Sequence, residues 1–211
     1  MNDVIVFGGG GSAGRTVVEE SRRRGLTVTA VVRDPARHAD LAADGVTLAQ
    51  GDVLDAERIA ELARGHRSAV AAVYDGLSDA GTFYPAASRA LLSGLSRAEV
   101  GRLVVVTLSS LLPGADGVPL LDSSDYPQEH RGFILAHRAG VEVLQAHSGD
   151  IDWLAISPTG DFDRQAGRSG KYRVSHGDSA ARLSYADLAV AIVDEVATPR
   201  HHRVHIGIDA E

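Results

Sequence analysis

The stretch Val4-Ile5-Val6-Phe7-Gly8-Gly9-Gly10-Gly11-Ser12-Ala13-Gly14 decides the fold class of this chain. Its apolar first half is typical of a buried strand, and the residues from Thr16 to Arg24 that follow it have a helical pattern, which Gly25 ends. A glycine-rich turn between a strand and a helix indicates a dinucleotide-binding unit more strongly than the glycines alone. A turn with only a structural use is the alternative.

Three of these glycines, Gly8, Gly11 and Gly14, are spaced Gly-x-x-Gly-x-x-Gly. We expect Gly8 to turn the chain off the strand with a positive φ. Gly11 lets the backbone approach a pyrophosphate, and Gly14 lets the helix pack close to the strand. The N–H groups around Ser12 and Ala13 would then point at the phosphates, together with the positive end of the helix dipole.

Strand and helix patterns alternate along the rest of the chain. This alternation predicts an α/β fold, a doubly wound parallel sheet of the NAD(P)-binding Rossmann type, in a single domain over residues 1–211. The loops after the fifth and sixth strands should form a small lobe over the carboxyl edge of the sheet, where ligands bind in such folds. The strands predicted after the first are Thr27–Val32, Val46–Gln50, Ser68–Val73, Arg102–Thr107, Ile151–Ile156 and Val204–Ile208, with a short one at Tyr172–Val174. The helices predicted after the first are Pro35–Leu41, Ala56–Ala63, Pro85–Ala98, Gln128–His147 and a last one that is capped by Ser184 and runs to Ala197.

Composition narrows the class of protein. The chain has 211 residues, is 44% hydrophobic and has no apolar run as long as a membrane span. It contains no cysteine, which excludes disulfides, thiolate catalysis and cysteine metal sites. The acidic start Met1-Asn2-Asp3 is unlike a signal peptide, so we expect a cytoplasmic protein. A net charge of −7 argues against a nucleic-acid partner. We expect a small-molecule substrate and no membrane partner, and the sequence does not decide between a monomer and an oligomer.

Arg33 stands 19 residues after Gly14, at the end of the second predicted strand. The residue in this place meets the adenosine ribose, where an arginine can hold a 2′-phosphate and an acidic residue accepts hydrogen bonds from a 2′-hydroxyl. Arg33 therefore favours NADP, and the adjacent Asp34 keeps NAD as the alternative. Asp52 and Val53, after the third strand, could border the adenine, or Asp52 could only shape the turn.

Several segments of the chain form a recognisable set. They are the glycine turn, residues 31–35 (Val-Val-Arg-Asp-Pro), 51–53 (Gly-Asp-Val), 156–159 (Ile-Ser-Pro-Thr) with Phe162, and 184–191 (Ser-Tyr-Ala-Asp-Leu-Ala-Val-Ala). With them the chain resembles the atypical short-chain dehydrogenase/reductases, and among them the NAD(P)H-binding NmrA-like proteins and the biliverdin/flavin reductase-type proteins. The resemblance covers essentially the whole chain.

The resemblance implies a set of cofactor-binding residues. The nicotinamide should lie near the loops after the fourth, fifth and sixth strands, with Pro158 and Thr159 close to it. The loop Tyr74-Asp75-Gly76 should also border the cofactor. The remaining candidates are Gly8, Gly11, Ser12, Ala13, Gly14, Arg33, Asp52 and Val53.

The catalytic residues are where this chain departs from its relatives. The main short-chain dehydrogenases use a serine and a Tyr-x-x-x-Lys pair on one helical face, where the lysine lowers the tyrosine pKa. Ser109 follows the fifth strand, as the serine should, and Tyr126 with His130 gives Tyr-x-x-x-His. Tyr126 could instead precede the helix. His137 is a weaker candidate for the same role, and we expect it to be a solvated helix residue. The only lysine, Lys171, falls in a polar loop.

No metal site is expected, because the histidines lack ligand spacings such as His-Glu-x-x-His, and residues 201–205 (His-His-x-x-His) fit a surface cluster. The leading hypothesis is an NADPH-dependent reductase that passes hydride to a flavin, quinone or carbonyl acceptor. A non-catalytic NAD(P)-sensing regulator of the NmrA-like kind is the alternative. A nucleotide-sugar epimerase or dehydratase fits less well, because 211 residues leave little room for a substrate domain.

Overall fold

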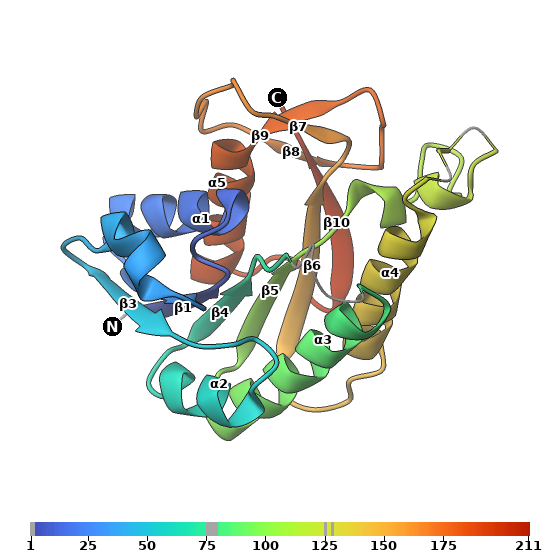
Figure 1. Ribbon diagram of the computed structural model, residues 1–211. Helices are drawn as coiled ribbons and strands as arrows, with labels where there is room; N and C mark the ends of the chain where they lie inside the picture. Colours follow the sequence, from blue (N-terminus) through green and yellow to red (C-terminus); the bar gives the residue numbers. More distant parts are fainter. Residues whose placement is uncertain (1–2, 75–79, 125, 128) are drawn as a thin grey trace.

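The computed structural model describes residues 3–74, 80–124, 126–127 and 129–211. In these residues eight strands form one sheet in the order β3-β2-β1-β4-β5-β6-β10-β8 (Figure 1). All neighbours are parallel except β8, which runs antiparallel to β10 at the edge. The strands are β1 (Asp3–Phe7), β2 (Thr27–Val32), β3 (Val46–Gln50), β4 (Ser68–Ala71), β5 (Arg102–Val106), β6 (Asp152–Pro158), β8 (Arg173–Ser175) and β10 (Val204–Asp209).

The strand order confirms the predicted doubly wound fold. The chain winds outward from β1 to β3, then returns to the other side of β1 and continues through β4, β5 and β6. The direction of winding therefore reverses between β1 and β4, and in such sheets ligands bind at the carboxyl ends of the strands at this point. The glycine turn directly follows β1, so the predicted cofactor site lies at the reversal.

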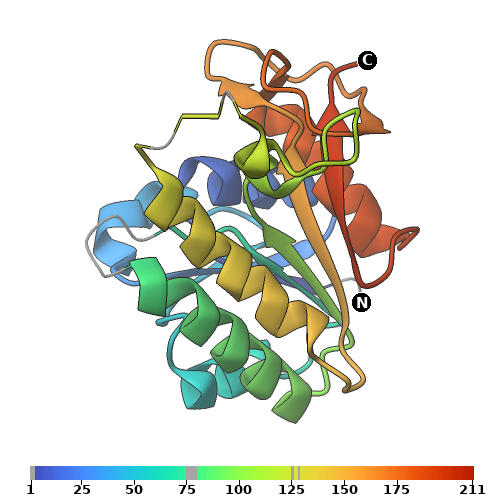
Figure 2. The ribbon, with the colours of Figure 1, turned by 90° about the vertical axis from the view of Figure 1, so that its right-hand side faces the viewer.

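Helices cover both faces of the sheet. On one face α1 (Ser12–Arg23) packs beside α5 (Tyr185–Ala197), and on the other lie α2 (Ala56–Ala63), α3 (Ala80–Arg97) and α4 (Arg131–Gln145). Figure 2 shows α3 and α4 side by side across the second face. In the described residues no helix is both long and apolar enough to cross a bilayer.

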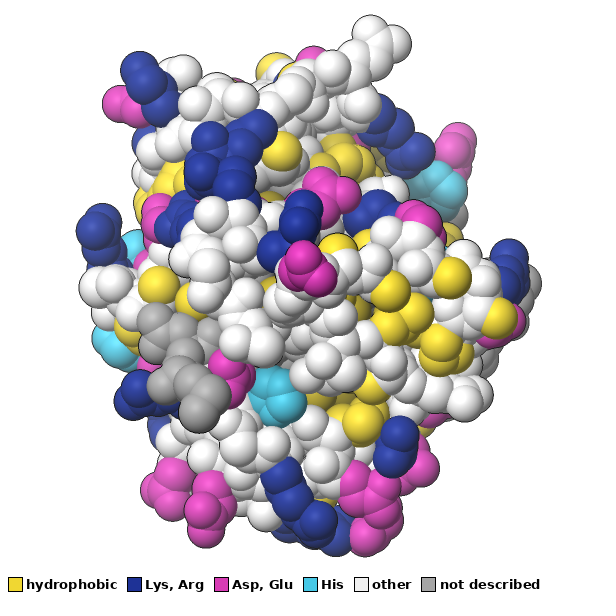
Figure 3. All heavy atoms as spheres, turned by 90° about the vertical axis from the view of Figure 1, so that its left-hand side faces the viewer, with side chains coloured by type: hydrophobic (Ala, Val, Ile, Leu, Met, Phe, Trp, Pro, Cys, Tyr) yellow, Lys and Arg dark blue, Asp and Glu magenta, His cyan; other side chains and the backbone are white. Residues whose placement is uncertain are grey.

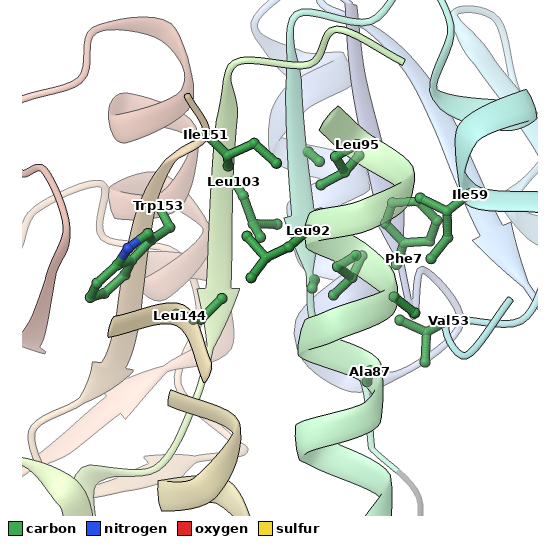
Figure 4. Packing of buried hydrophobic residues seen from close by; sticks show 14 of the residues in the cluster. Phe7, Val53, Ile59, Ala87, Leu92, Leu95, Leu103, Leu144, Ile151 and Trp153 are labelled. Carbon is green, nitrogen blue, oxygen red and sulfur yellow. The ribbon is translucent and has the colours of Figure 1, made fainter. Parts of the chain in front are cut away.

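The alternation of side chains along β1 explains the two cores. Val4 and Val6 pack with the α1 and α5 side, whereas Ile5 and Phe7 point to the other face. Successive strand residues point to opposite faces, so a strand covered by helices on both sides is apolar throughout. Figure 4 shows the second core, in which Phe7 packs with residues of α2, α3 and the neighbouring strands.

Some element boundaries differ from the prediction. The helix expected to begin at Pro85 begins at Ala80, and the buried side chains of Phe83 and Tyr84 explain why the chain is already helical before the proline. The first N–H groups of a helix have no partner within the helix, so a proline this close to the N-terminus removes few hydrogen bonds. The segment Pro35–Leu41 is a 3₁₀ helix (η1) with non-helical angles at His38.

Other element ends also differ from the prediction. β4 stops at Ala71, two residues early, although the Ala72 N–H still donates to the Phe7 carbonyl at 2.9 Å. β6 runs on to Pro158, because β10 pairs with it to that residue. The helix predicted over residues 128–147 is shorter, Arg131–Gln145, and Gln128 lies outside the described residues.

The loops after β5 and β6 contain the small lobe that the sequence predicted. Figure 1 shows β7, β8 and β9 gathered at the top of the molecule, beyond the end of β6. β7 (Asp161–Asp163) and β9 (Arg182–Ser184) form a separate two-stranded parallel sheet. The loop after β5 holds two short 3₁₀ helices, η2 (Ser109–Leu111) and η3 (Leu120–Asp122).

A carboxylate on α5 connects the lobe to the helix. The Ser184 hydroxyl caps α5 by accepting the Asp187 N–H at 2.9 Å, as predicted. The Asp187 carboxylate, which would return to the cap backbone in a full capping box, instead accepts the N–H groups of Ser169 and Gly170 at 2.9 and 2.8 Å. Asp187 therefore orients the lobe as well as belonging to the first turn of α5.

A second buried carboxylate, Glu20 on α1, makes the same kind of connection. It is 4% exposed and accepts hydrogen bonds from Arg23, Arg24 and the lobe residue Arg168 at 2.8–2.9 Å. Burial by itself raises the pKa of Glu20, but the three guanidinium groups outweigh it and hold the pKa well below its usual range. On the face drawn in Figure 3, basic and acidic side chains likewise lie next to one another.

We predict that Glu20→Gln lowers the free energy of unfolding at pH 7 by about 1.5–3 kcal/mol, the range for hydrogen bonds to a charged group. Because the folded pKa of Glu20 is below the unfolded value of 4.5, its stabilisation is complete above that pH and is lost as the pH falls. Urea unfolding between pH 3 and 7 should show a weaker pH dependence in the variant. Glu19→Gln, an exposed neighbour on α1, is the matched control and should behave as wild type.

Candidate cofactor site

The glycine turn has the backbone geometry that the sequence predicted. Gly8 has φ +80°, and a Cβ there would lie 2.3 Å from the carbonyl oxygen of Ala72, the residue directly after β4. A Cβ on Gly14 would lie 2.1 Å from the Gly8 carbonyl oxygen. Both distances are far below contact, so neither position accepts a side chain without moving the backbone. The helix and both strands approach one another through these two glycines.

Gly11 differs from the other two glycines, because the space beside it is open. A Cβ there would meet only the Gly8 carbonyl oxygen, at 3.5 Å. Gly11 is the N-cap of α1 with no side-chain cap, and the first intrahelical bond runs from the Arg15 N–H to its carbonyl at 2.8 Å. Ser12 and Ala13 come before this first bond, so their N–H groups have no acceptor within the helix. The open space and these donors form a cradle that suits a phosphate group.

A cavity of about 430 Å³ lies in front of this cradle, at the ends of β1, β2, β3 and β4. Its size suits part of a dinucleotide. Most of the candidates predicted for the glycine turn, the ribose and the adenine meet in it, although they come from distant parts of the chain. Its lining includes Gly8, Gly11, Arg33, Asp52, Val53 and Tyr74.

Both interpretations of Asp52 agree with its geometry. Its side chain lines the cavity, and its Oδ1 accepts the Leu54 N–H at 2.9 Å, which shapes the turn after β3. Tyr74 is 69% exposed at the cavity and makes an edge contact with Phe133, with ring centroids 6.0 Å apart. Asp75 and Gly76, predicted beside Tyr74, lie outside the described residues.

His38 is a cavity residue that the sequence gave no reason to choose. Its imidazole packs against Gly10, where a Cβ would lie 2.5 Å from the ring. The contact depends on the non-helical angles of His38 inside η1, which no spacing in the sequence reveals. The four consecutive glycines gave only a weak signal, since Gly10 is outside the Gly-x-x-Gly-x-x-Gly pattern and a side chain there would only require the His38 ring to move. Arg15, which follows the glycine turn, forms an ion pair with Asp40 of η1.

The candidates near the nicotinamide do not line this cavity. Pro158 ends β6 opposite Ile208 of β10, and the Thr159 N–H donates to the Ile208 carbonyl at 2.9 Å. Both residues are buried. Ser109 begins η2, three residues after the end of β5. Their contact with a nicotinamide stays a prediction.

The structure does not give Tyr126 and His130 the helical spacing of a catalytic pair. Both precede α4, which begins at Arg131 with His130 as its N-cap residue. The i, i+4 spacing aligns two side chains only inside a helix. The alternative weighed for Tyr126, a place before the helix, is the one observed. A catalytic role for either residue therefore has no support from a shared helical face.

The residues that do share a face of α4 at this spacing are Phe133 and His137, whose ring centroids are 4.8 Å apart. The expectation that His137 is solvated is wrong, since it is 8% exposed and stacks on Tyr84 at 3.6 Å. Burial lowers the pKa of His137 to about 3, so its ring is neutral at physiological pH. Sequence reasoning missed the pair because a phenylalanine carries no signal for acid–base chemistry.

Comparison with known proteins agrees with this geometry. The sequence profile of a family described as NAD(P)H-binding matches residues 8–199. The protein YwnB of Bacillus subtilis, which is uncharacterised, is 28% identical over 216 residues, covering 98% of this chain and 97% of YwnB.

Two solved structures have the same fold. A provisionally named epimerase from Bacteroides thetaiotaomicron is 25% identical, with a TM-score of 0.86 over 99% of this chain and 97% of the other. A provisionally named NADH-flavin reductase from Streptococcus pneumoniae is 23% identical, with a TM-score of 0.85 over the whole of both chains. The family match begins at Gly8 and spans both the glycine cradle and the strand ends that form the cavity. This chain is a member of the NAD(P)H-binding family.

Proposed function

We propose that the chain is an NADPH-dependent reductase that passes hydride to a small conjugated acceptor, such as a flavin or quinone. The observation that carries the proposal is the glycine cradle beside the cavity, which accepts a phosphate where Gly11 leaves the backbone open. The name of the Streptococcus relative, an NADH-flavin reductase, points to the same class of reaction. When bound, the nicotinamide supplies the hydride, and the protein positions it.

The choice of NADPH over NADH rests on the residues after β2. Arg33 lines the cavity. The neighbouring Asp34, the group that could accept hydrogen bonds from a ribose 2′-hydroxyl, instead caps η1 by accepting the Ala36 N–H at 3.1 Å. A carboxylate that caps a helix is a poorer ribose acceptor, and an arginine suits a 2′-phosphate. The pair therefore favours NADP.

The choice of acceptor rests on α4. The Phe133 ring has no proton to give, and burial keeps His137 neutral, with a pKa of about 3. Hydride addition to a simple ketone produces an alkoxide that needs an acid nearby. A reduced flavin or quinone spreads the negative charge over a conjugated system and can take its proton from water. Flavins and quinones are therefore favoured over carbonyl compounds.

The lack of an acid on α4 also favours a second candidate, a non-catalytic NAD(P)-sensing regulator. A protein that reports the cofactor redox state needs the cradle and the cavity, but no acid and no acceptor site. The two functions differ in turnover.

NADPH oxidation over a panel of flavins, quinones and ketones tests the proposal. We expect oxidation at 340 nm above the enzyme-free rate with at least one flavin or quinone and none with ketones. Because free flavins and quinones react slowly with NADPH, each acceptor needs its own blank. NADPH binding without turnover on any acceptor would overturn the reductase and support the regulator.

Arg33→Ala should weaken NADPH binding by about 10- to 100-fold, the value of one charged hydrogen bond of about 1.5–3 kcal/mol. Binding of NADH should change little, because it lacks the 2′-phosphate. Fluorescence titration with both cofactors gives the ratio. Arg22→Ala, an exposed arginine on α1, is the control. An unchanged NADPH/NADH ratio in Arg33→Ala shows that Arg33 does not recognise the phosphate.

Gly11→Ala separates cofactor binding from folding. The φ of Gly11 is −79° and the space beside it is open, so alanine fits the free protein and the urea midpoint should stay that of wild type. The added methyl would occupy the place of the phosphate, so we expect at least a tenfold loss of affinity for both cofactors. Gly14→Ala is the comparison and should be strongly destabilised by its contact with the Gly8 carbonyl. Full cofactor affinity in Gly11→Ala would place the phosphates elsewhere.

A further inference from the structure

A second, much smaller cavity lies behind the cofactor cavity, between the sheet and the helices α3 and α4. It measures about 20 Å³ and is lined mainly by apolar side chains, among them Ala87, Leu91 and Val105. Val73 lines both cavities, so this space lies next to the predicted cofactor site. Neither the glycine cradle nor the proposed reaction uses it.

Buried polar side chains also line this cavity, among them Ser88, Thr107 and His137. Thr107, which follows β5, is 6% exposed, and His137 on α4 is 8% exposed. Within the described part of the chain, neither the Thr107 Oγ1 nor the His137 Nε2 has a hydrogen-bond partner, and both atoms are shielded from bulk solvent. Buried polar atoms in folded proteins are nearly always paired, with protein or with ordered water.

The size of the cavity fits one water molecule. A water needs roughly 10–15 Å³ of such space and two to four polar partners, while cavities that stay dry are apolar. The 20 Å³ here exceeds the minimum and is too small for a larger ligand. The two unpaired atoms give the space the polarity that a water requires.

We propose that this cavity binds one water molecule, which bridges the Thr107 hydroxyl at the end of β5 and the His137 Nε2 on α4. The Thr107 backbone is fixed by its N–H, which donates to the Ile156 carbonyl at 2.9 Å. The His137 ring is fixed between Tyr84 and Phe133, at 3.6 and 4.8 Å. Both partners are therefore held in place before the water binds.

The neutral state of His137 agrees with this bridge. A neutral imidazole can donate or accept at Nε2, a hydroxyl can do either, and a water matches each combination. The bridge would tie α4 to the carboxyl end of β5, and so hold Phe133 and His137 in the position that they have behind the cofactor cavity. The proposal does not depend on which reaction the protein catalyses.

The substitution Thr107→Val tests the proposal through the sign of its effect. Valine has the shape of threonine without the hydroxyl. If the water is bound, the variant loses a hydrogen bond and its urea midpoint falls below that of wild type. If the cavity is dry, the variant removes an unsatisfied buried hydroxyl and its midpoint rises, because an unpaired buried polar group is destabilising. A midpoint at or above that of wild type overturns the proposal.

Thr107→Ser is the matched control, since it keeps the hydroxyl and loses one methyl group. With the water bound, Thr107→Val should lack the hydrogen bond that Thr107→Ser retains, and a high-resolution crystal structure of Thr107→Ser should keep the water. The direct measurement is a crystal structure of the wild-type protein at about 1.5 Å resolution. Electron density within hydrogen-bonding distance of both Oγ1 and Nε2 is the expected result, and a cavity without density at that position contradicts the proposal even if Thr107→Val fails to fold.

Discussion

The absence of a Cβ at Gly8 and Gly14 is the constraint on which the rest of the structure depends. The Gly14 position lies against the Gly8 carbonyl, and Gly8 lies against the carbonyl of Ala72, directly after β4. These two contacts bring together the central strand, its neighbour and the first helix. A side chain at either position would push α1 or β4 away and open the sheet at the point where its winding reverses. The same backbone contacts leave Gly11 facing open space, so the constraint that closes the fold also creates the cradle.

Charged hydrogen bonds connect the lobe to the helices beneath it, in addition to the apolar contacts of Leu183 and Phe162. Asp187 on α5 accepts backbone N–H groups of Ser169 and Gly170, and Glu20 on α1 accepts the Arg168 guanidinium. Burial disfavours a charged carboxylate, and at Glu20 the hydrogen bonds from three arginines outweigh that penalty and lower its pKa. The lobe is thereby tied to the two helices on one face of the sheet, one of which begins at the glycine turn.

The proposed choice of acceptor depends on two side chains of the helix α4. Phe133 and His137 lie beside Tyr84, and His137 is buried and neutral. Stacking on Tyr84 and burial hold His137 in one position and remove its charge. The proposed reductase, without an acid on this helix, would suit acceptors that stabilise the negative charge themselves, and the proposed regulator would need no acid.

The sequence by itself determined the fold class, the central place of the glycine turn and the family, because strand and helix periodicities and glycine spacings are local patterns. It also placed the end of β2 at Val32 and the cap of α5 at Ser184, where local preferences agree with the packing. Only the tertiary structure decided that His38 packs on Gly10, that Arg168 reaches Glu20 across 148 residues and that α3 begins before Pro85. It also decided that the aligned pair on α4 is Phe133 and His137, not Tyr126 and His130. These features depend on which side chains from distant parts of the chain come into contact, and on where burial outweighs local preference at a helix end. The spacing of residues along the chain indicates neither of these two things.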